Sequence, residues 1–256
     1  MNNAIFITVR NGSTRLPNKA LINFNGMTVI EYIIQRHKNA KVCDSIILCT
    51  TENKNDDSLI DIAKKNNINF FRGSETDKLE RWKGAADEFD VKYIVTADGD
   101  DLFCEPKLID LAFEQFEKSQ PDFIQANGVI CGAFTYGIKS DALRKACEIK
   151  DTSNTEMMWV FFTQTNLFKI EELQKVPMKF YRNDIRMTLD YKEDLDFFNA
   201  IIKKGWSGNY LTLDEILEII EKEPYLKDIN FYRQQEFLNN QKNKTILKVK
   251  DNFSRE

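Results

Sequence analysis

The chain has 256 residues, of which 42% are hydrophobic and 30% are charged, and its formal net charge is −4. This length fits one large α/β domain, and the absence of a basic excess argues against a nucleic-acid partner. The sequence contains no run of about eighteen apolar residues and no charged signal-peptide start, so we expect neither a membrane span nor secretion.

The cysteines and the single histidine indicate a cytoplasmic protein without a histidine-based metal site. The five cysteines are far apart and form no C-x-x-C pair: Cys43, Cys49, Cys104, Cys131 and Cys147. We expect them to be reduced thiols. The single histidine, His37, lies in a helical pattern and is expected at the surface.

In the first half of the chain, short apolar runs alternate with helical patterns. Strands are predicted at residues 4–9, 45–49, 69–71 and 92–97, and helices at residues 28–39, 56–67, 76–89 and 106–118. This alternation predicts a mostly parallel sheet with helices on both faces.

The second half of the chain has a looser pattern. Strands are predicted within residues 122–138 and at residues 185–189, and helices at residues 154–166, about 192–204 and about 213–222. We expect residues 1–225 to form one domain. Residues 226–256 are polar and are expected to form a helical or loose tail.

The loop after the first predicted strand, residues 10–19, is suited to binding phosphate. It contains a glycine, two hydroxyl side chains and three cations: Gly12, Ser13, Thr14, Arg10, Arg15 and Lys19. Backbone amides and hydroxyls can surround phosphate oxygens while the cations neutralise their charge. The Gly-Lys-Ser/Thr ending of a Walker loop is missing. An ordinary solvated loop is the alternative, although three cations are more than a turn requires.

Carboxylates follow two other predicted strands. Asp98, Asp100 and Asp101 come after residues 92–97, and Asp190 comes after residues 185–189. Crowded carboxylates repel one another unless a cation is present, and Mg²⁺ prefers oxygen ligands. If the two strands are neighbours, Asp100 and Asp190 can bind one Mg²⁺ together with a polyphosphate. The alternatives are a solvated Asp-Gly turn and, for Asp190, a helix N-cap.

Together these parts predict the transfer of a nucleoside monophosphate. An acceptor oxygen attacks the α-phosphorus and pyrophosphate leaves in line, while the protein supplies positioning and charge neutralisation. We expect Asp100 and Asp190 to bind the metal. Arg15 and Lys19 are expected to stabilise the charge on the leaving pyrophosphate.

Four segments match the motifs of one enzyme family in order and spacing over residues 4–202. They are residues 7–19 (ITVRNGSTRLPNK), 71–81 (FRGSETDKLER), 99–106 (GDDLFCEP) and 187–195 (MTLDYKEDL). The chain thereby resembles CMP-sugar synthetases, in particular the spore-coat-polysaccharide-type and Kdo-type cytidylyltransferases. The resemblance implies a Rossmann-like α/β nucleotidyltransferase fold, CTP as donor and Mg²⁺ as cofactor. It also implies a homodimer with a small dimerisation and acceptor arm, expected at about residues 130–180.

The resemblance also implies contacts with the two substrates. With the phosphate loop included, the residues expected to bind the nucleotide are Arg10, Asn11, Gly12, Ser13, Thr14, Thr51, Glu52, Arg72, Arg81 and Asp98. For the acceptor, the family positions correspond to Asn127, Gly132 and Glu156.

The acceptor half also contains three cations among aromatic residues: Lys139, Arg182 and Arg186, with Phe134, Tyr136, Trp159 and Tyr181. Cations near a pocket suit a carboxylate, phosphate or phosphonate, although ordinary surface charge is the alternative. We therefore expect an acidic, ulosonic-acid-type sugar as acceptor, for surface glycan synthesis. The alternatives are a phosphonate or a phosphorylated polyol or sugar as acceptor, a nucleotide-sugar glycosyltransferase, and a degenerate nucleotide-binding protein.

Overall fold

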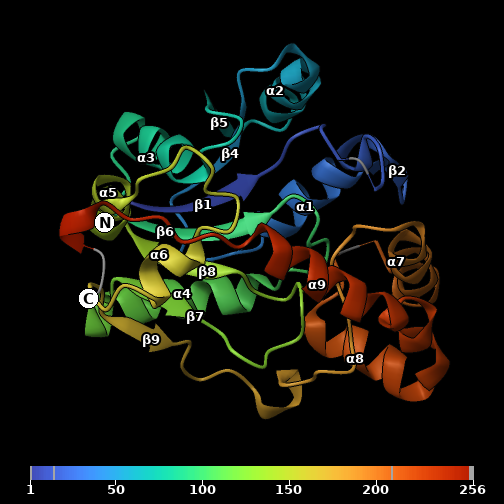
Figure 1. Ribbon diagram of the computed structural model, residues 1–256. Coiled ribbons are helices and arrows are strands. Elements are labelled where there is room, and N and C mark those ends of the chain that lie inside the picture. The colour runs from blue at the N-terminus through green and yellow to red at the C-terminus, as the bar shows by residue number, and fades with distance from the viewer. Residues whose placement is uncertain (1, 14, 209, 254–256) are drawn as a thin grey trace.

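A seven-stranded mixed sheet forms the centre of the computed structural model, which describes residues 2–13, 15–208 and 210–253 (Figure 1). The strand order is β5-β4-β1-β6-β8-β7-β9. The parallel half consists of β1 (Asn3–Thr8), β4 (Ser45–Thr51), β5 (Asn69–Gly73) and β6 (Tyr93–Asp98). The other half consists of β8 (Tyr136–Lys139), β7 (Phe123–Gln125) and β9 (Ile170–Glu172). The strand β8 runs antiparallel to its neighbours β6 and β7, and β9 pairs with β7 in parallel. The predicted mixed, mostly parallel sheet is confirmed.

Helices cover both faces of this sheet. Those that contribute to the first core cluster are α1 (Val29–His37), α2 (Asp57–Lys65), α4 (Pro106–Ser119), α7 (Lys192–Gly205) and α8 (Leu213–Lys222). Those that contribute to the second cluster are α3 (Lys78–Glu88), α5 (Ser140–Ile149) and α6 (Trp159–Thr163). Alternate residues of β1 serve the two clusters, because successive side chains of a strand point to opposite faces. Ile5 and Ile7 belong to the first cluster, and Ala4 and Phe6 belong to the second.

The parallel pairing of β1 with β6 positions the loops that carry the polar motifs. In this register Thr8 lies opposite Asp98, so both strands end at the same edge of the sheet. The backbone N–H of Gly99 then donates to the Thr8 carbonyl at 2.8 Å. The phosphate loop and the carboxylate segment therefore leave the sheet side by side.

The prediction of a strand at residues 185–189 is wrong, because this segment is an irregular loop. This segment forms only an isolated bridge between Cys131 and Arg186. Its backbone N–H groups bond to two loops, since Met187 donates to the Cys131 carbonyl and Leu189 to the Asp100 carbonyl, each at 2.8 Å. The segment nevertheless brings Asp190 next to Asp100.

Residues 130–180, expected to include a dimerisation and acceptor arm, are part of the sheet and its core, and their role in dimerisation stays a prediction. They contribute β8 and β9, and their helices α5 and α6 pack in the second core cluster. The helix expected at residues 154–166 is shorter than predicted and covers Trp159–Thr163. This region belongs to the core because its apolar side chains, such as Leu143 and Phe161, are fully buried.

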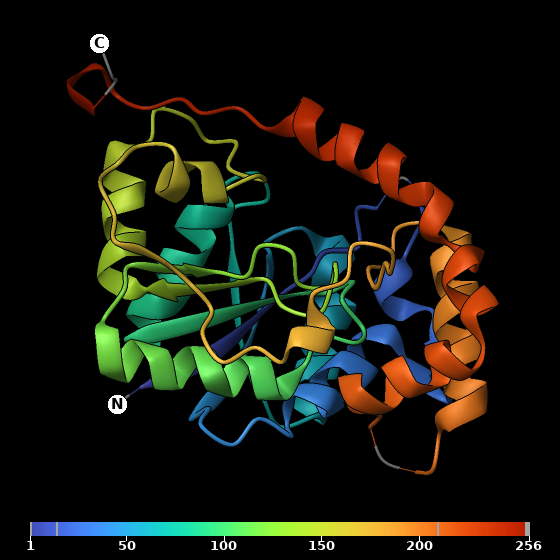
Figure 2. The ribbon, with the colours of Figure 1, turned by 90° about the horizontal axis from the view of Figure 1, so that it is seen from below.

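The C-terminal residues lie against the domain. Two 3-10 helices, Pro224–Ile229 and Phe231–Arg233, lead into α9 (Gln234–Lys244). Figure 2 shows α9 in red crossing from the side of α7 and α8 towards the side of α5 and α6. Beyond α9, Val249 forms an antiparallel bridge with Lys150. In the described part of the chain, no helix combines the length and apolar character needed to cross a membrane.

His37 is buried, whereas the sequence predicted an exposed position. Only 1% of its surface is accessible, and its Nδ1 lies 2.6 Å from the Ile33 carbonyl oxygen. Its Nε2 is buried and has no hydrogen-bond partner among the residues that the structure describes. Burial lowers the pKa of His37 from 6.5 to about 4, because a charged imidazolium would lose its hydration.

The burial of His37 predicts a loss of stability in acid. The unfolded chain binds a proton below about pH 6.5, whereas the folded chain binds it only below about pH 4, so stability falls as the pH drops through this window. We expect His37→Gln to reduce the loss of unfolding free energy between pH 7 and pH 5 by about 2 kcal/mol. Urea unfolding of both proteins at both pH values measures this difference. Equal losses would show that His37 does not cause it.

Candidate active site

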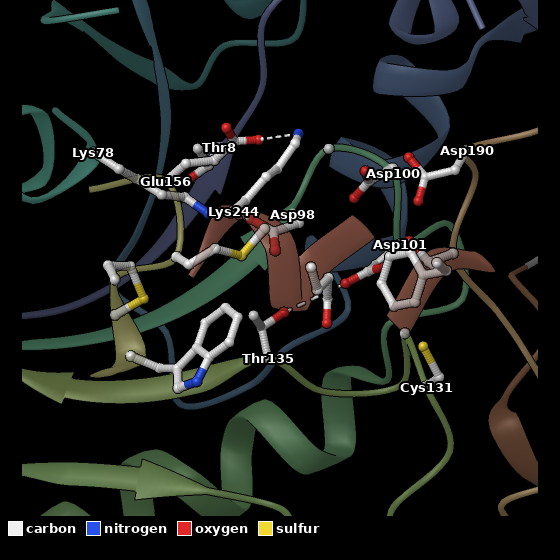
Figure 3. A pocket seen from close by; sticks show the side chains of 18 of the residues that line it. Thr8, Lys78, Asp98, Asp100, Asp101, Cys131, Thr135, Glu156, Asp190 and Lys244 are labelled. Atoms are coloured by element: carbon white, nitrogen blue, oxygen red, sulfur yellow. Dashed lines mark hydrogen bonds and ion pairs between the residues drawn. The ribbon is translucent and has the colours of Figure 1, made fainter. Parts of the chain in front are cut away.

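A cavity of about 680 Å³ opens where β1 and β6 end (Figure 3). One side is lined by residues of the phosphate loop, the start of α3 and residues 98–101. The other side is lined by residues 126–136, residues 154–159 and α9. This position matches the rule that open parallel sheets bind ligands beyond the carboxyl ends of their strands.

The phosphate loop contributes most of its predicted residues to the cavity. Those that line it are Arg10, Gly12, Ser13, Arg15 and Lys19. Thr14 lies outside the described residues. Asn11 does not line the cavity but anchors the loop, because its backbone N–H donates to Asp56 at 2.8 Å and its side chain donates to the Asn55 carbonyl at 2.7 Å.

The four residues predicted to be catalytic meet at one point. The Lys19 ammonium lies 2.6 Å from Asp100 Oδ2 and 3.0 Å from Asp190 Oδ1. It also donates to the Leu189 carbonyl at 2.8 Å. The Arg15 guanidinium lies 2.5 Å from Asp190 Oδ1. Two cations from one loop thus connect carboxylates from two distant segments.

The charges of these groups are strongly coupled. Burial by itself lowers the pKa of Lys19, but Asp100 and Asp190 outweigh this effect and raise it. Burial opposes ionisation of Asp190, yet Lys19 and Arg15 lower its pKa to about 2. Burial raises the pKa of Asp100 in spite of Lys19, and the charges of Asp190 and Asp98 add to the rise. Asp190 is therefore firmly ionised, while Asp100 lies in a region of excess negative charge.

The segment after β6 forms a cluster of carboxylates. Asp98, Asp100 and Asp101 each place a carboxylate oxygen within 4.8 Å of the others. Burial raises the pKa of Asp101 well above its ordinary value, and its two neighbours raise it further. The ligand atoms are all carboxylate oxygens, which Mg²⁺ prefers, so these residues fit a divalent cation. Asp190 is joined to this cluster through Lys19.

Arg186 is not available to an acceptor, so its predicted role is wrong. Its side chain is fully buried and forms an ion pair with Asp194 at 2.9 Å. It also lies 3.4 Å from Asp190. Asp194 in turn accepts the backbone N–H groups of Asp190 and Tyr191 at 2.8 and 2.9 Å. Arg186 therefore holds in place the segment that carries Asp190.

Lys139 lies at the wrong end of the sheet to bind an acceptor. Because β8 runs antiparallel to β6, its first residue, Tyr136, pairs with Thr96 near the cavity. Its last residue, Lys139, pairs with Tyr93 at the opposite edge. The prediction failed because the sequence did not show the direction of this strand.

Three of the residues expected to hold the nucleoside stand beside the cavity and do not line it: Thr51, Glu52 and Arg72. The Thr51 hydroxyl lies 2.5 Å from Asp56, the residue that anchors the phosphate loop. Arg72 donates to the Thr51 carbonyl at 2.9 Å and pairs with Asp57 at 2.7 Å. In this structure Thr51 and Arg72 brace the phosphate loop, and their direct contact with a nucleoside stays a prediction.

Arg81 lines the cavity as a buried cation. It is 4% exposed, and its guanidinium donates to the Ser74 carbonyl at 2.7 Å. Within the described residues it has no carboxylate at ion-pair distance, and its Nε has no hydrogen-bond partner. A buried cation without a counter-ion is costly, so the site is prepared for an anionic ligand.

Asn127, Gly132 and Glu156 all line the cavity, as expected for acceptor residues. Gly132 has a φ of +87°, and a Cβ there would lie 2.1 Å from the Met187 carbonyl oxygen. Glycine thus permits the loop after β7 to pack directly against the segment that carries Asp190.

The sequence reasoning missed several residues that line the cavity. Lys78 pairs with Asp98 at 3.0 Å and was detectable, since it lies within the matched segment 71–81. The missed residues on the other side belong to α9: Gln234, Phe237, Leu238, Asn240, Gln241 and Lys244. Phe134, Tyr136 and Trp159, which the sequence suggested as aromatic neighbours of the acceptor cations, line the cavity as well. Those of α9 had no signal, because this polar helix has no buried residue and resembles a solvated tail.

Comparison with known proteins finds relatives that match most of this chain. The cytidylyltransferase family profile matches residues 4–247. The uncharacterized protein MJ1063 of Methanocaldococcus jannaschii is 30% identical over 226 residues, which cover 88% of this chain and 92% of that protein. The spore coat polysaccharide biosynthesis protein SpsF of Bacillus subtilis is 24% identical over 232 residues, covering 88% and 96%.

The solved structure of a cytidylyltransferase from Leptospira borgpetersenii serovar Hardjo-bovis shares the fold. It superposes with a TM-score of 0.79 at 26% sequence identity, over 88% of this chain and 96% of that chain. The predicted nucleotidyltransferase fold is confirmed. The family profile covers nearly the whole chain, including all four matched segments, and the chain is therefore a member of the cytidylyltransferase family.

Proposed function

We propose that this cytidylyltransferase transfers CMP from CTP to an acidic, ulosonic-acid-type sugar with release of pyrophosphate, for surface glycan synthesis. The observation that carries the proposal is the meeting of Arg15 and Lys19 with Asp100 and Asp190. Cations directed at a leaving pyrophosphate, next to carboxylates suited to Mg²⁺, are the parts that phosphoryl transfer requires.

In this proposal the nucleotide occupies the side of the cavity formed by the phosphate loop and α3. Arg81 supplies the buried cation that lacks a counter-ion. Arg10 pairs only loosely with Glu75, at 3.8 Å, and remains available to a phosphate. Asp100 and Asp190 would hold Mg²⁺, with Asp98 and Asp101 beside Asp100, and the ion when bound neutralises phosphate charge and orients the α-phosphate.

The acceptor occupies the opposite wall. Phe134, Tyr136 and Trp159 offer flat apolar surfaces to a sugar ring, and Asn127 offers an amide. The acceptor hydroxyl oxygen forms a bond to the α-phosphorus, and the bond to pyrophosphate breaks in line. Arg15 and Lys19 stabilise the charge that develops on the pyrophosphate. The acidic sugar class is supported by the family resemblance and by the polysaccharide role in the name of the Bacillus subtilis relative.

Pyrophosphate release tests this function. Each of the four ribonucleoside triphosphates would be combined with Mg²⁺ and with ulosonic acids, phosphorylated sugars and polyols, or phosphonates. We expect release with CTP and an ulosonic acid. Release with CTP and a phosphonate or phosphorylated polyol would replace the acceptor, and release with another triphosphate would overturn the CMP assignment.

Lys19→Ala is expected to slow transfer by about 100-fold or more, because it removes a cation that stabilises the negative charge on the leaving pyrophosphate. The measurement is kcat with the acceptor that the wild-type protein uses. Lys107→Ala, on the exposed surface of α4, removes one lysine away from the cavity and should retain the wild-type rate. A Lys19 variant with the same rate as the Lys107 variant would exclude the loop from catalysis.

A further inference from the structure

The C-terminal segment, residues 234–250, runs from the side of α7 and α8 towards the side of α5 and α6 (Figure 2). We call it the strap, because residues of its helix α9 line the cavity and both of its ends are attached to the domain. At its start, the Phe237 ring lies 4.3 Å from the Arg186 guanidinium, and Gln234 accepts from Arg186 at 3.2 Å. At its end, Lys250 donates to the Ile149 carbonyl at 2.9 Å, and the Lys248 carbonyl accepts from the Asp151 N–H at 2.9 Å. The strap is thus held by the domain on both sides of the cavity.

Between these attachments the strap presents its polar side chains to the cavity. Asn240, Gln241 and Lys244 all line it. The Lys244 ammonium lies 3.0 Å from the Glu156 carboxylate, which belongs to the loop before α6 (Figure 3). No residue of α9 is buried, and its middle and end are held mainly by polar contacts such as this one.

Lys244 and Glu156 come from the wall opposite the phosphate loop and α3, yet they lie near Arg10 and Lys78. Besides Lys244 itself, Arg10 and Lys78 act on the charge of Glu156 and favour its ionised form. Arg10, Lys78 and Lys244 each have a carboxylate partner in this structure, at 3.8, 3.0 and 3.0 Å. Three cations from three separate elements therefore converge on one part of the cavity.

The contact between Lys244 and Glu156 is easily exchanged for another. The two side chains are 47% and 40% exposed, and an exposed ion pair of this kind contributes little to stability. A triphosphate carries several negative charges and strong acceptor oxygens, so it can replace a single exposed carboxylate as the partner of an ammonium.

We propose that Lys244 is a nucleotide-binding residue delivered by the C-terminal strap, and that its ammonium exchanges Glu156 for the phosphates of the bound triphosphate. The strap thus forms part of the wall around the nucleotide. Glu156, which the sequence assigns to the acceptor, serves as the resting partner of Lys244. This inference rests on the proposed use of a nucleoside triphosphate, and it does not depend on the identity of the acceptor.

Calorimetric titration with CTP and Mg²⁺ tests the role of Lys244. Lys244→Ala should raise the Kd for CTP about tenfold, the loss expected for one charged hydrogen bond, and Lys244→Arg should keep most of the affinity. Lys242→Ala is the matched control, because it removes an exposed lysine of the same helix that does not line the cavity. Equal affinities of the Lys244→Ala and Lys242→Ala variants would overturn the proposal.

Glu156→Gln is expected to change the affinity for CTP in the opposite direction from Lys244→Ala, or to leave it unchanged. If Glu156 competes with the nucleotide for Lys244, this variant should bind CTP as tightly as the wild-type protein or more tightly. If it weakens binding as Lys244→Ala does, the pair only supports the structure and the proposal is wrong.

Failure of the proposed function has a different signature. If the wild-type protein binds another triphosphate in place of CTP, the CMP assignment falls, and the same variants test the strap with that triphosphate. If it binds none of the four, both proposals fall together.

Discussion

Asp100→Asn is expected to lower kcat by about 1,000-fold or more while the protein remains folded. The change removes one negative charge from the carboxylate cluster without changing the side-chain volume, so the site loses a ligand for Mg²⁺. The fold should persist because burial already disfavours the charge of Asp100, and because Lys19 keeps its contacts with Asp190 and the Leu189 carbonyl. Pyrophosphate release measures the rate, and circular dichroism measures the fold.

Asp61→Asn is the matched control for this substitution. It neutralises an exposed carboxylate of α2, outside the cavity, and should leave kcat unchanged. An Asp100→Asn variant that keeps a near-normal rate would show that Asp100 is not the metal ligand. Asp190, Asp98 and Asp101 would then remain as the candidate ligands.

Arg186→Met is expected to lower the free energy of unfolding by about 3–5 kcal/mol, the cost of leaving a buried charge without its partner. Arg186 and Asp194 are both fully buried, and methionine fills much of the arginine volume without supplying a charge. Asp194 would keep its hydrogen bonds from Asp190 and Tyr191 but lose its cation. Urea unfolding measures the change.

Two further variants show whether the buried charge is the cause. Arg182→Met breaks the half-exposed pair of Arg182 with Asp184 and should cost less than about 1 kcal/mol. Adding Asp194→Asn to Arg186→Met removes the stranded charge and should restore part of the loss. A double variant less stable than Arg186→Met would show that Asp194 does not need Arg186 as its counter-ion.

The sequence by itself was informative wherever chemistry follows a strongly patterned element. The apolar runs before Arg10 and before Asp98 predicted two strands of a parallel sheet, and both are present as β1 and β6. Since parallel strands end at the same edge, the phosphate loop and the carboxylate segment had to lie together. The convergence of Lys19 with Asp100 followed from this local reasoning.

The position of Asp190 was predicted correctly for a partly wrong reason. A strand was expected before it, whereas the segment is held by bonds to loops and by the close approach that Gly132 permits. Such contacts join residues that are far apart in the sequence, and no periodic pattern records them. The sequence placed it in one site with Lys19 and Arg15, but their direct ion pairs appear only in the structure.

Only the tertiary structure decided which charged residues face the cavity. The sequence suggested both Arg186 and Lys139 as acceptor cations. In the structure Arg186 is buried in an ion pair with Asp194, and Lys139 lies at the end of β8 that is far from the cavity. Conversely, α9 lines the cavity although its composition is that of a solvated tail. A helix that lies over an open cavity needs no apolar face, so its sequence carries no signal of this position. Composition and spacing determined the fold and the phosphate site. The other wall of the cavity depends on the direction of short strands and on the path of the C-terminal strap, and local sequence patterns encode neither of them.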